Sequence, residues 1–528
     1  MNDFTRRRFI ERLGMVGGTF AVNAALNAFG VPTASAAETP PELRGSGKGK
    51  KIIILGAGHA GNTAAYELSA LGYAVTVLEA RSFAGGRAQS ARRGFAAQEL
   101  AGEAQTCSFD EGQYINIGPW RIPYWHRSTL YYTKKFNVPI ETMVNDNDAS
   151  FVMAKDVKGG LAGKRVRAGE IKADMQGYVS EILAKAAGTG KFDDLVAPED
   201  RQIFVDYIVG QGYLSRKDLA YRGTDGRGMK TNPGAGLVPG EQSDPYAFRD
   251  VLDSGLWNGM RSVAGYEMQR TMLQPVGGMY KIAEGFYRAM GHMIRFNCEV
   301  ERIRQTDKAV TVDYLDTKTG KRSTLTADFM ICTIPLPVLH QLDTDFSDEF
   351  KTAMEGVSYS MVGKIGLQMK RRFWEEDYGI YGGHVRMAKA GKFGNYSISL
   401  PSGGFQAQKG VLLAAYLNGQ RAVQVSRLSL AERIDYCLEA GEMIFPGQYR
   451  ANFESGFSWF WHRAKYNQGG WAQWTEEGRK TAYPKLLEPQ GRIYLAGEHL
   501  SYLTGWQAGA FESAWQQIEK LHRRASEI

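Results

Sequence analysis

A glycine-rich turn between a strand and a helix is the feature that most constrains the fold of this chain. Residues 51–55 form a β-branched apolar run, which predicts a buried parallel strand. The run leads directly into GAGHAG at 56–61 and then into a helical pattern with one apolar face. A second strand is predicted over 74–78 and ends at Glu79. This order of elements predicts a dinucleotide-binding βαβ unit.

Each glycine of the turn has its own task in such a unit. Gly56 permits the tight turn, Gly58 lets the backbone approach a pyrophosphate, and Gly61 lets helix and strand pack closely. The phosphates are expected at the helix N-terminus, beside Ala60. Glu79 stands at a strand end, where a carboxylate accepts hydrogen bonds from ribose hydroxyls. The competing interpretation is a glycine-rich turn that binds nothing.

The residues after Glu79 identify a family. Ala80-Arg81 is followed by Gly85-Gly86-Arg87, a second glycine pair with an arginine that can meet the pyrophosphate. This continuation resembles the FAD-binding start of the flavin amine oxidases, which include monoamine, polyamine and L-amino acid oxidases. The resemblance implies non-covalently bound FAD. It also implies an α/β architecture: a Rossmann-like FAD domain of the glutathione-reductase type, an interleaved antiparallel-sheet substrate domain and a helical insertion.

The C-terminal region carries a second motif of the same kind. Residues 493–499 read as a buried strand that ends in Gly497 and Glu498, and a helix is expected from Phe511. By resemblance, Glu498 holds the ribityl or phosphate region of FAD and the following helix points at the isoalloxazine ring. The same resemblance assigns further residues to the cofactor, namely Gly118, Pro119, Trp120, Arg121, Val300, Trp506, Gln507 and Ala508. The alternative is a strand-helix unit without a ligand.

Lys364 lies in a predicted strand over 361–367. The matching family strand carries a lysine that reaches the reactive nitrogen of the flavin through a water molecule. A lysine there orients water and stabilises the charge that develops when reduced flavin meets oxygen. The competing interpretation is a solvent-facing strand lysine.

The segment 118–126, GPWRIPYWH, resembles that of the L-amino acid oxidases rather than that of the amine oxidases. In that branch the arginine, here Arg121, binds the substrate carboxylate, and a guanidinium suits this task because it is planar, always charged and bidentate. Trp120 departs from the methionine that the family more often has. The alternative for Arg121 is an ion pair that ties a loop to the sheet.

Aromatic residues complete the expected substrate site. Trp506 matches the aromatic wall beside the substrate amine, and Trp471 is expected to line the same pocket. The family's second carboxylate ligand is a tyrosine just before a proline, but here Leu400 precedes Pro401, so Tyr396 is the candidate substitute.

The expected reaction is oxidative deamination of an L-amino acid by oxygen, giving a 2-oxo acid, ammonia and hydrogen peroxide. No histidine occurs between His126 and His292, so hydride transfer from the alpha carbon of a neutral amine is favoured over a mechanism with a histidine base. The alternatives are an amine oxidase for substrates without a carboxylate, an amino acid monooxygenase, a dehydrogenase that reduces a quinone or cytochrome, and a flavin-binding scaffold without turnover.

The N-terminus reads as a targeting signal. Thr5 to Ile10 contains a twin-arginine pattern, followed by a mildly apolar run and by Ala34-Ser35-Ala36, a small-residue cleavage site. Export by the twin-arginine machinery to the periplasm or the exterior is therefore expected. A basic amphipathic helix is the alternative.

Composition limits the other function classes. Removal of residues 1–36, which hold four arginines and two acids, reduces the net charge from +8 to +6, and no basic run suggests nucleic-acid binding. The four cysteines lie far apart, which favours buried thiols over a metal site or a disulfide framework.

The expected domain boundaries follow from the motifs. A signal peptide is expected at 1–36, and the substrate domain and the helical insertion are expected to overlap at 127–150. The FAD domain is predicted from 46–118, 270–340 and 486–528, the substrate domain from 119–150 and 341–485, and the helical domain from 127–262. A homodimer is the expected assembly.

Overall fold

The computed structural model describes residues 38–192, 194–263 and 265–527. The predicted signal peptide at 1–36 lies outside these residues. In the described ranges, no helix is long and apolar enough to cross a membrane.

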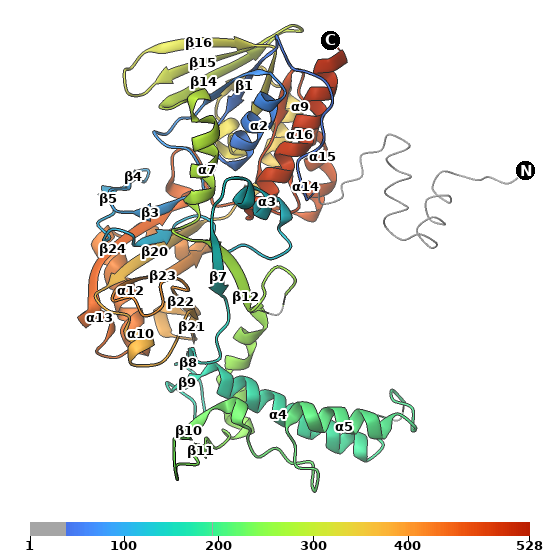
Figure 1. The fold of residues 1–528 in the computed structure, drawn as a ribbon, viewed down its shortest axis with the longest axis vertical. Helices are drawn as coiled ribbons and strands as arrows, with labels where there is room; N and C mark the ends of the chain where they lie inside the picture. Colours follow the sequence, from blue (N-terminus) through green and yellow to red (C-terminus); the bar gives the residue numbers. More distant parts are fainter. Residues whose placement is uncertain (1–37, 193, 264, 528) are drawn as a thin grey trace, which may run out of the picture.

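A five-stranded parallel sheet forms the centre of the upper body in Figure 1. Its order is β13 (Ile294–Arg295), β2 (Ala74–Leu78), β1 (Lys51–Leu55), β17 (Phe329–Cys332) and β26 (Ile493–Leu495). Ile54 pairs with Val77 on one side and with Ile331 on the other. Strands from three distant parts of the sequence therefore build one Rossmann-type sheet, as expected for the predicted fold class.

Both faces of this sheet are covered. Ile52 and Ile54 pack on the side of α2 (His59–Ala70), α7 (Tyr280–Met290) and α16 (Gln507–Glu527). Ile53 and Leu55 face the opposite core, which is built largely by β14 (Cys298–Gln305), β15 (Val310–Asp316) and α9 (Asp348–Glu355). Burial on both sides explains why 51–55 is continuously apolar instead of alternating.

A seven-stranded sheet forms the middle of the molecule (Figure 1). Its order is β24 (Phe453–Phe460), β20 (Val362–Met369), β23 (Gly410–Asn418), β22 (Tyr396–Leu400), β21 (Gly383–Ala388), β8 (Phe151–Ala154) and β9 (Arg165–Arg167). Helix α12 (Leu430–Ile444) contributes to the core on one face of it.

The last two strands of this sheet come from the range expected to form the helical insertion. Residues Phe151–Ala154 are all buried, and Val152 pairs in parallel with Arg386 of β21. A run of four apolar residues is compatible with a strand and with a buried helical turn. Only the pairing with β21 shows that these residues form a strand.

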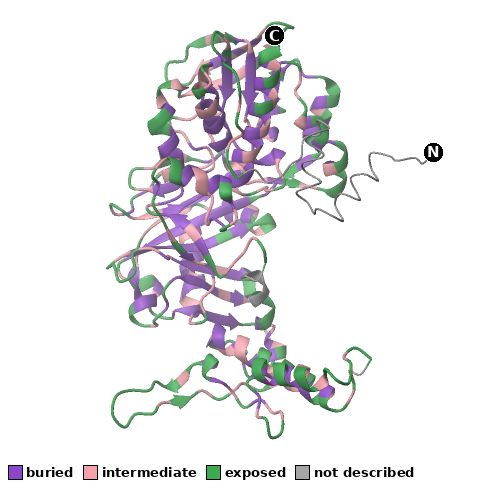
Figure 2. Ribbon diagram, turned by 45° about the vertical axis from the view of Figure 1, so that its right-hand side comes forward, coloured by how far each residue is buried: buried purple, intermediate pink, exposed green. Residues whose placement is uncertain are grey.

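The rest of that range forms an arm that projects from the body at the bottom of Figure 1. It contains α4 (Ala168–Gly188), α5 (Arg201–Gly212), β10 (Met229–Thr231), β11 (Glu241–Gln242) and α6 (Phe248–Ser254). Figure 2 shows that burial concentrates in the two sheets and that most of the arm surface is exposed.

A small polar cluster fixes the base of the arm. Asp174 and Arg227 form an ion pair with both side chains fully buried. Tyr221 donates its hydroxyl proton to the same carboxylate at 2.9 Å, and the Tyr246 backbone N–H donates at 2.9 Å. Such a pair is costly to break on one side only, because the remaining charge is buried without a partner.

All four cysteines are buried free thiols, as the sequence predicted.

Candidate active site

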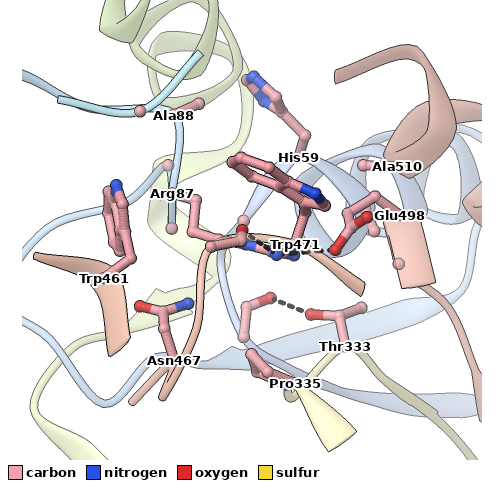
Figure 3. A pocket seen from close by; sticks show the side chains of 18 of the residues that line it. His59, Arg87, Ala88, Thr333, Pro335, Trp461, Asn467, Trp471, Glu498 and Ala510 are labelled. Carbon is pink, nitrogen blue, oxygen red and sulfur yellow. Dashed lines mark hydrogen bonds and ion pairs between the residues drawn. The ribbon is translucent and has the colours of Figure 1, made fainter. Parts of the chain in front are cut away.

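One cavity of about 430 Å³ runs between the parallel sheet and the seven-stranded sheet. Its walls come from the β1–α2 turn, from β20 and β23, from the segment 117–121, and from the turn that leads into α16. Figure 3 shows part of this pocket, with the Arg87–Glu498 pair and the nearby His59, Trp461 and Trp471.

The first glycine turn is shaped as the motif requires. Gly56 has φ +96°, a conformation that favours glycine, and a Cβ on Gly61 would lie 1.9 Å from the Gly56 carbonyl oxygen. Helix α2 therefore packs directly on the turn. Gly58 faces Gly86 across the cavity wall, since a Cβ on Gly86 would lie 3.1 Å from the Gly58 Cα. No side chain caps the N-terminus of α2, so its first amide groups remain available to an anion.

Glu79 is held in place at the end of β2. One carboxylate oxygen accepts from the Ala57 N–H at 2.7 Å and the other from the Arg81 N–H at 2.9 Å. The Arg81 guanidinium donates to the Asn467 amide oxygen and lies 5.3 Å from the Tyr466 ring centroid. Ala80 and Val300 line the same end of the cavity. This fixed carboxylate presents its remaining lone pairs to the cavity, as a ribose-binding acid must.

Glu498 links the two halves of the cavity. Its carboxylate accepts from Arg87 at 2.7 Å, from the Ala472 N–H at 3.2 Å and from the Gly505 N–H at 3.0 Å. The Gly505 contact fixes the turn that leads into α16. The first residue of this helix, Gln507, accepts a hydrogen bond from the His59 ring through its amide oxygen at 2.7 Å. The N-termini of α2 and α16 thus meet at one cavity.

Lys364 lies in the wall between the two sheets. Its amine donates to the Asn116 carbonyl at 3.2 Å and to the Gly118 carbonyl, and its side chain is 2% exposed. The Trp120 and Tyr416 ring centroids lie 5.2 and 4.6 Å from the amine. Burial lowers the pKa of Lys364 well below its ordinary value, and the nearby Arg121 charge lowers it further.

Arg121 lines the cavity without an acidic partner. Its guanidinium donates to the Asn145 amide oxygen at 2.6 Å and lies 3.5 Å from the His384 ring nitrogen. Among the described residues no carboxylate lies within ion-pair distance of it. Burial lowers the pKa of Arg121, and repulsion by Arg386 acts in the same direction. The loop-tying ion pair considered as an alternative is therefore absent from the described structure.

Neutral polar groups support Arg121 from behind. The His384 ring lies 3.2 Å from the Asn145 amide oxygen and 2.7 Å from the Ser399 hydroxyl. Burial lowers the pKa of His384 well below its ordinary value, with Arg121 and Arg386 adding to the effect. A neutral ring with its proton on Nε2 satisfies both contacts, because Nε2 then donates to Asn145 and Nδ1 accepts from Ser399. The amide oxygen of Asn145 is thus shared by two donors.

Trp506 lines the cavity beside the start of α16 and meets His126 edge to face, with ring centroids 4.9 Å apart. Burial lowers the pKa of His126 to about 4, so its ring is neutral at pH 7. Trp471 lies against Gly505, where a Cβ would be 3.4 Å from the indole. Trp506 and Trp471 therefore give the cavity aromatic walls.

Most residues expected to bind cofactor or substrate line this one cavity. They are Gly56, Gly58, Ala60, Glu79, Ala80, Arg81, Gly86, Arg87, Gly118, Pro119, Trp120, Arg121, Val300, Lys364, Trp471, Gly497, Glu498, Trp506 and Gln507. Gly61 and Ala508 are buried behind the lining, in α2 and α16.

Tyr396 does not reach the cavity. It lies on the same face of β22 as Ile398 and Leu400 and packs in the core, with its ring 5.8 Å from Phe393. Alternation along the strand turns Ser399 to the other face, where it meets His384. The expectation that Tyr396 contacts the substrate is therefore corrected.

Tyr416 lines the cavity instead. It pairs with Lys364 across β23 and β20, and its ring lines the cavity 4.6 Å from the Lys364 amine. The sequence motif drew attention to the tyrosine near a proline. The sequence of the strand 410–418 gives the only indication for Tyr416. There a tyrosine, with its polar hydroxyl, follows a run of small and aliphatic residues.

Comparison with known proteins gives the family. The model of the flavin-containing amine oxidoreductases matches residues 60–198 and 243–517. The chain belongs to this family. It is a flavin-dependent oxidoreductase, and its cofactor is FAD.

Relatives and solved structures extend the comparison. An L-amino acid oxidase of Lachesis muta is 29% identical over 499 residues, covering 91% of this chain and 88% of the relative. An L-amino-acid oxidase of Bothrops atrox is 28% identical over 494 residues, covering 91% and 90%.

Among solved structures, putrescine oxidase bound to putrescine matches with a TM-score of 0.57 at 16% identity, covering 91% of this chain and 99% of that chain. Cyclohexylamine oxidase from Brevibacterium oxydans IH-35A matches with a TM-score of 0.55 at 16% identity, covering 90% and 99%. At this identity the structural likeness supports the fold alone.

The cavity fits FAD on its own geometry. It has two close-packed glycine turns, an uncapped helix N-terminus and a fixed acid at the end of the second strand, in the order that the phosphates and ribose require.

Proposed function

We propose that this flavoenzyme oxidises L-amino acids. The substrate, oxygen and water give a 2-oxo acid, ammonia and hydrogen peroxide. The observation that carries the proposal is Arg121, a partly buried arginine without a carboxylate partner among the described residues, which lines the same cavity as Trp506. A guanidinium in this setting favours a carboxylate ligand, because a charge-assisted bidentate pair offsets the burial of its charge.

The residues of the cavity divide the work of binding. Arg121 binds the substrate carboxylate. Tyr416, which lines the same cavity, supplies a hydroxyl as the second ligand of that carboxylate. Trp506 and Trp471 shape the space for the amine. Aromatic walls disfavour an ammonium by desolvation, so the amine binds in its neutral form.

FAD supplies the acceptor for the hydride that leaves the alpha carbon. With a neutral amine no strong base is needed, because the nitrogen lone pair forms the C=N bond of an iminium as the hydride departs, and this iminium is the protonated imino acid. Water then hydrolyses the released imino acid to the 2-oxo acid and ammonia. Arg121 keeps the carboxylate fixed during transfer, which holds the alpha carbon in one orientation.

Lys364 is the proposed group for the oxygen half of the reaction. Its amine is held by the Asn116 and Gly118 carbonyls and can orient a water molecule at the cavity wall. Lys364→Met should slow reoxidation of the reduced enzyme by oxygen at least tenfold in stopped-flow experiments, while anaerobic reduction by substrate changes less. Equal slowing of both half-reactions would contradict this role.

Arg121→Met tests the carboxylate site. We expect kcat/KM for L-amino acids to fall by about 100-fold or more, with Arg121→Lys intermediate because one ammonium cannot form the bidentate pair. Bound FAD, measured by absorbance, should remain. The rival amine oxidase would be supported if the native enzyme oxidises no L-amino acid and Arg121→Met oxidises amines as fast as the native enzyme does.

Product analysis separates the remaining rivals. A monooxygenase yields an amide and carbon dioxide, and a dehydrogenase consumes little oxygen. FAD that stays oxidised under excess substrate without oxygen would instead indicate a scaffold.

Export and assembly belong to the same proposal. The twin-arginine pattern supports transport to the periplasm or the exterior, and replacing Arg6 and Arg7 by lysine should leave the enzyme in the cytoplasm.

A homodimer is supported by apolar side chains on the arm, with Ile203 70% and Tyr207 63% exposed. Light scattering of Ile203→Glu should then show a smaller mass than the native protein. An unchanged mass would count against the arm as the contact.

A further inference from the structure

One carboxylate in the wall of the cavity has no role in the site described above. Glu267 lines the cavity together with Met268. It lies between the arm and β12 (Thr271–Pro275). Neither the family motifs nor the expected mechanism assign it a function.

The other charged groups of the lining are already paired or hydrogen-bonded. Arg87 pairs with Glu498, and Arg81 contacts Asn467. Glu79 accepts two backbone N–H groups, Lys364 donates to backbone carbonyls, and Glu299 accepts from Lys465 and Tyr466. Within the described part of the chain, Glu267 is the one cavity-lining carboxylate without a hydrogen bond or an ion pair.

Two contacts of residues beside Glu267 tie its turn to the segment that contains Arg121 and to Asn145. On one side of it, Tyr266 stacks on Trp125 with ring centroids 4.7 Å apart. On the other side, the Gln269 carbonyl accepts from the Asn145 amide at 2.8 Å, and Asn145 itself holds Arg121 at 2.6 Å. The turn Gly265–Met268 is closed by the Met268 N–H, which donates to the Gly265 carbonyl at 3.1 Å. The carboxylate and the guanidinium therefore line one cavity from segments that are tied together.

Neither Arg386 nor Arg270 forms an ion pair with Glu267 in the described part of the chain. The Arg386 guanidinium lies 3.7 Å from Asp146 and does not line the cavity. Arg270 also lies near Asp146, at 3.9 Å.

We propose that Glu267 selects L-amino acids with a cationic side chain, an ammonium or a guanidinium. This inference rests on the proposed function, because Arg121 takes the alpha carboxylate and Glu267 takes the charge at the far end of the side chain. The aliphatic stem of such a substrate packs on the aromatic walls and on Met268, as long cationic side chains pack on apolar surface. A neutral side chain would leave Glu267 desolvated without a partner, and a site with an unpaired buried polar group discriminates strongly against such a substrate.

The test compares substrates of nearly equal shape that differ in charge. L-arginine and L-citrulline form one such pair, and L-lysine and L-norleucine form a second. With the purified holoenzyme, kcat/KM should be at least about tenfold higher for the cationic member of each pair. This measurement needs no variant.

Glu267→Gln then identifies the residue responsible. The arginine-to-citrulline ratio of kcat/KM should fall at least about tenfold, chiefly through a higher KM for arginine. FAD content measured by absorbance reports whether the variant folds. The matched control is Glu111→Gln, a glutamate exposed in a turn, which should keep the native ratio.

The outcomes separate this inference from the function on which it rests. Equal turnover of arginine and citrulline, or a ratio that Glu267→Gln does not change, would overturn the selectivity and leave the amino acid oxidase intact. Turnover of agmatine, the decarboxylated form of arginine, without turnover of any L-amino acid would overturn the proposed function and with it this substrate class.

Discussion

At the scale of single residues, Arg121 is held by partners that carry no charge. Asn145, His384 and Ser399 form a neutral chain behind it, so the guanidinium keeps its full attraction for an incoming carboxylate. An acid in this position would compete with the substrate. The neutrality of the support is therefore as important as its geometry.

Asn145→Asp tests this neutrality with a nearly isosteric change. The new carboxylate would pair with Arg121, and we expect KM for L-amino acids to rise about tenfold to 100-fold while kcat changes less. Titration with benzoate, followed by the flavin spectrum, should show weaker binding by a similar factor. Asn395→Asp, on an exposed asparagine, is the control and should leave both values unchanged. Tight benzoate binding in Asn145→Asp would contradict the argument.

The sequence predicted the residues that lie within motifs, and missed those that only the fold brings together. Arg121 and Lys364 stand at recognisable positions in their segments. Asn145 and His384 belong to other segments and meet Arg121 through the pairing of β7 (Ile140–Val144) with β12 and through the seven-stranded sheet. Glu267 lines the same cavity from a third segment. Tyr396 was expected in the site and Tyr416 was missed, because the face of a strand depends on its register, which a single sequence does not show.

At the scale of elements, close packing of α2 on the β1–α2 turn positions the cofactor end of the cavity. Gly61 is the contact point, since a Cβ there would overlap the Gly56 carbonyl oxygen at 1.9 Å. The sequence predicted this packing from the spacing of the glycines. It did not predict β8, because Phe151–Ala154 acquires its strand conformation from the edge of a sheet built by residues far along the chain.

Gly61→Ala should push α2 away from the turn and weaken FAD binding. We expect the purified variant to retain less FAD and to unfold at a lower temperature, because the atom that blocks the methyl group is backbone and cannot move aside. Gly210→Ala in α5 is a matched control, since no atom lies within 4 Å of its Cβ position. Alanine in an open helical position should be neutral or add about 0.5–1 kcal/mol of stability. Full FAD occupancy in Gly61→Ala would disprove this account of the packing.

At the scale of the whole molecule, two sheets and three separated FAD-domain segments meet at one cavity. The order of the motifs made this arrangement predictable, because both glycine-containing strand ends belong to the same parallel sheet. The projecting arm was predictable only as a helical region. Its internal packing depends on contacts such as the Asp174–Arg227 pair, whose partners are far apart in sequence.

Burial of neutral histidines couples the stability of the molecule to pH. Burial lowers the pKa of His59 and His126 to about 4 and that of His499 to about 3, against an ordinary value near 6.5. Below pH 6.5 the unfolded chain binds protons at these residues while the folded protein does not. The stability that the neutral rings provide is therefore complete above pH 6.5 and is lost as the pH falls toward about 4.

The expected slope is about 1.4 kcal/mol per pH unit for each of these histidines within that window. Unfolding temperatures of the holoenzyme, measured with saturating FAD between pH 7.5 and 5, should fall steadily below pH 6.5. His499 offers a matched test, because both of its ring nitrogens are buried without hydrogen-bond partners among the described residues. His499→Gln removes one titrating group. The fall of the unfolding temperature below pH 6.5 should therefore become shallower, by about the contribution of one bound proton. An unfolding temperature that does not change from pH 7.5 to 5 would mean that the unfolded chain and the folded protein bind protons equally.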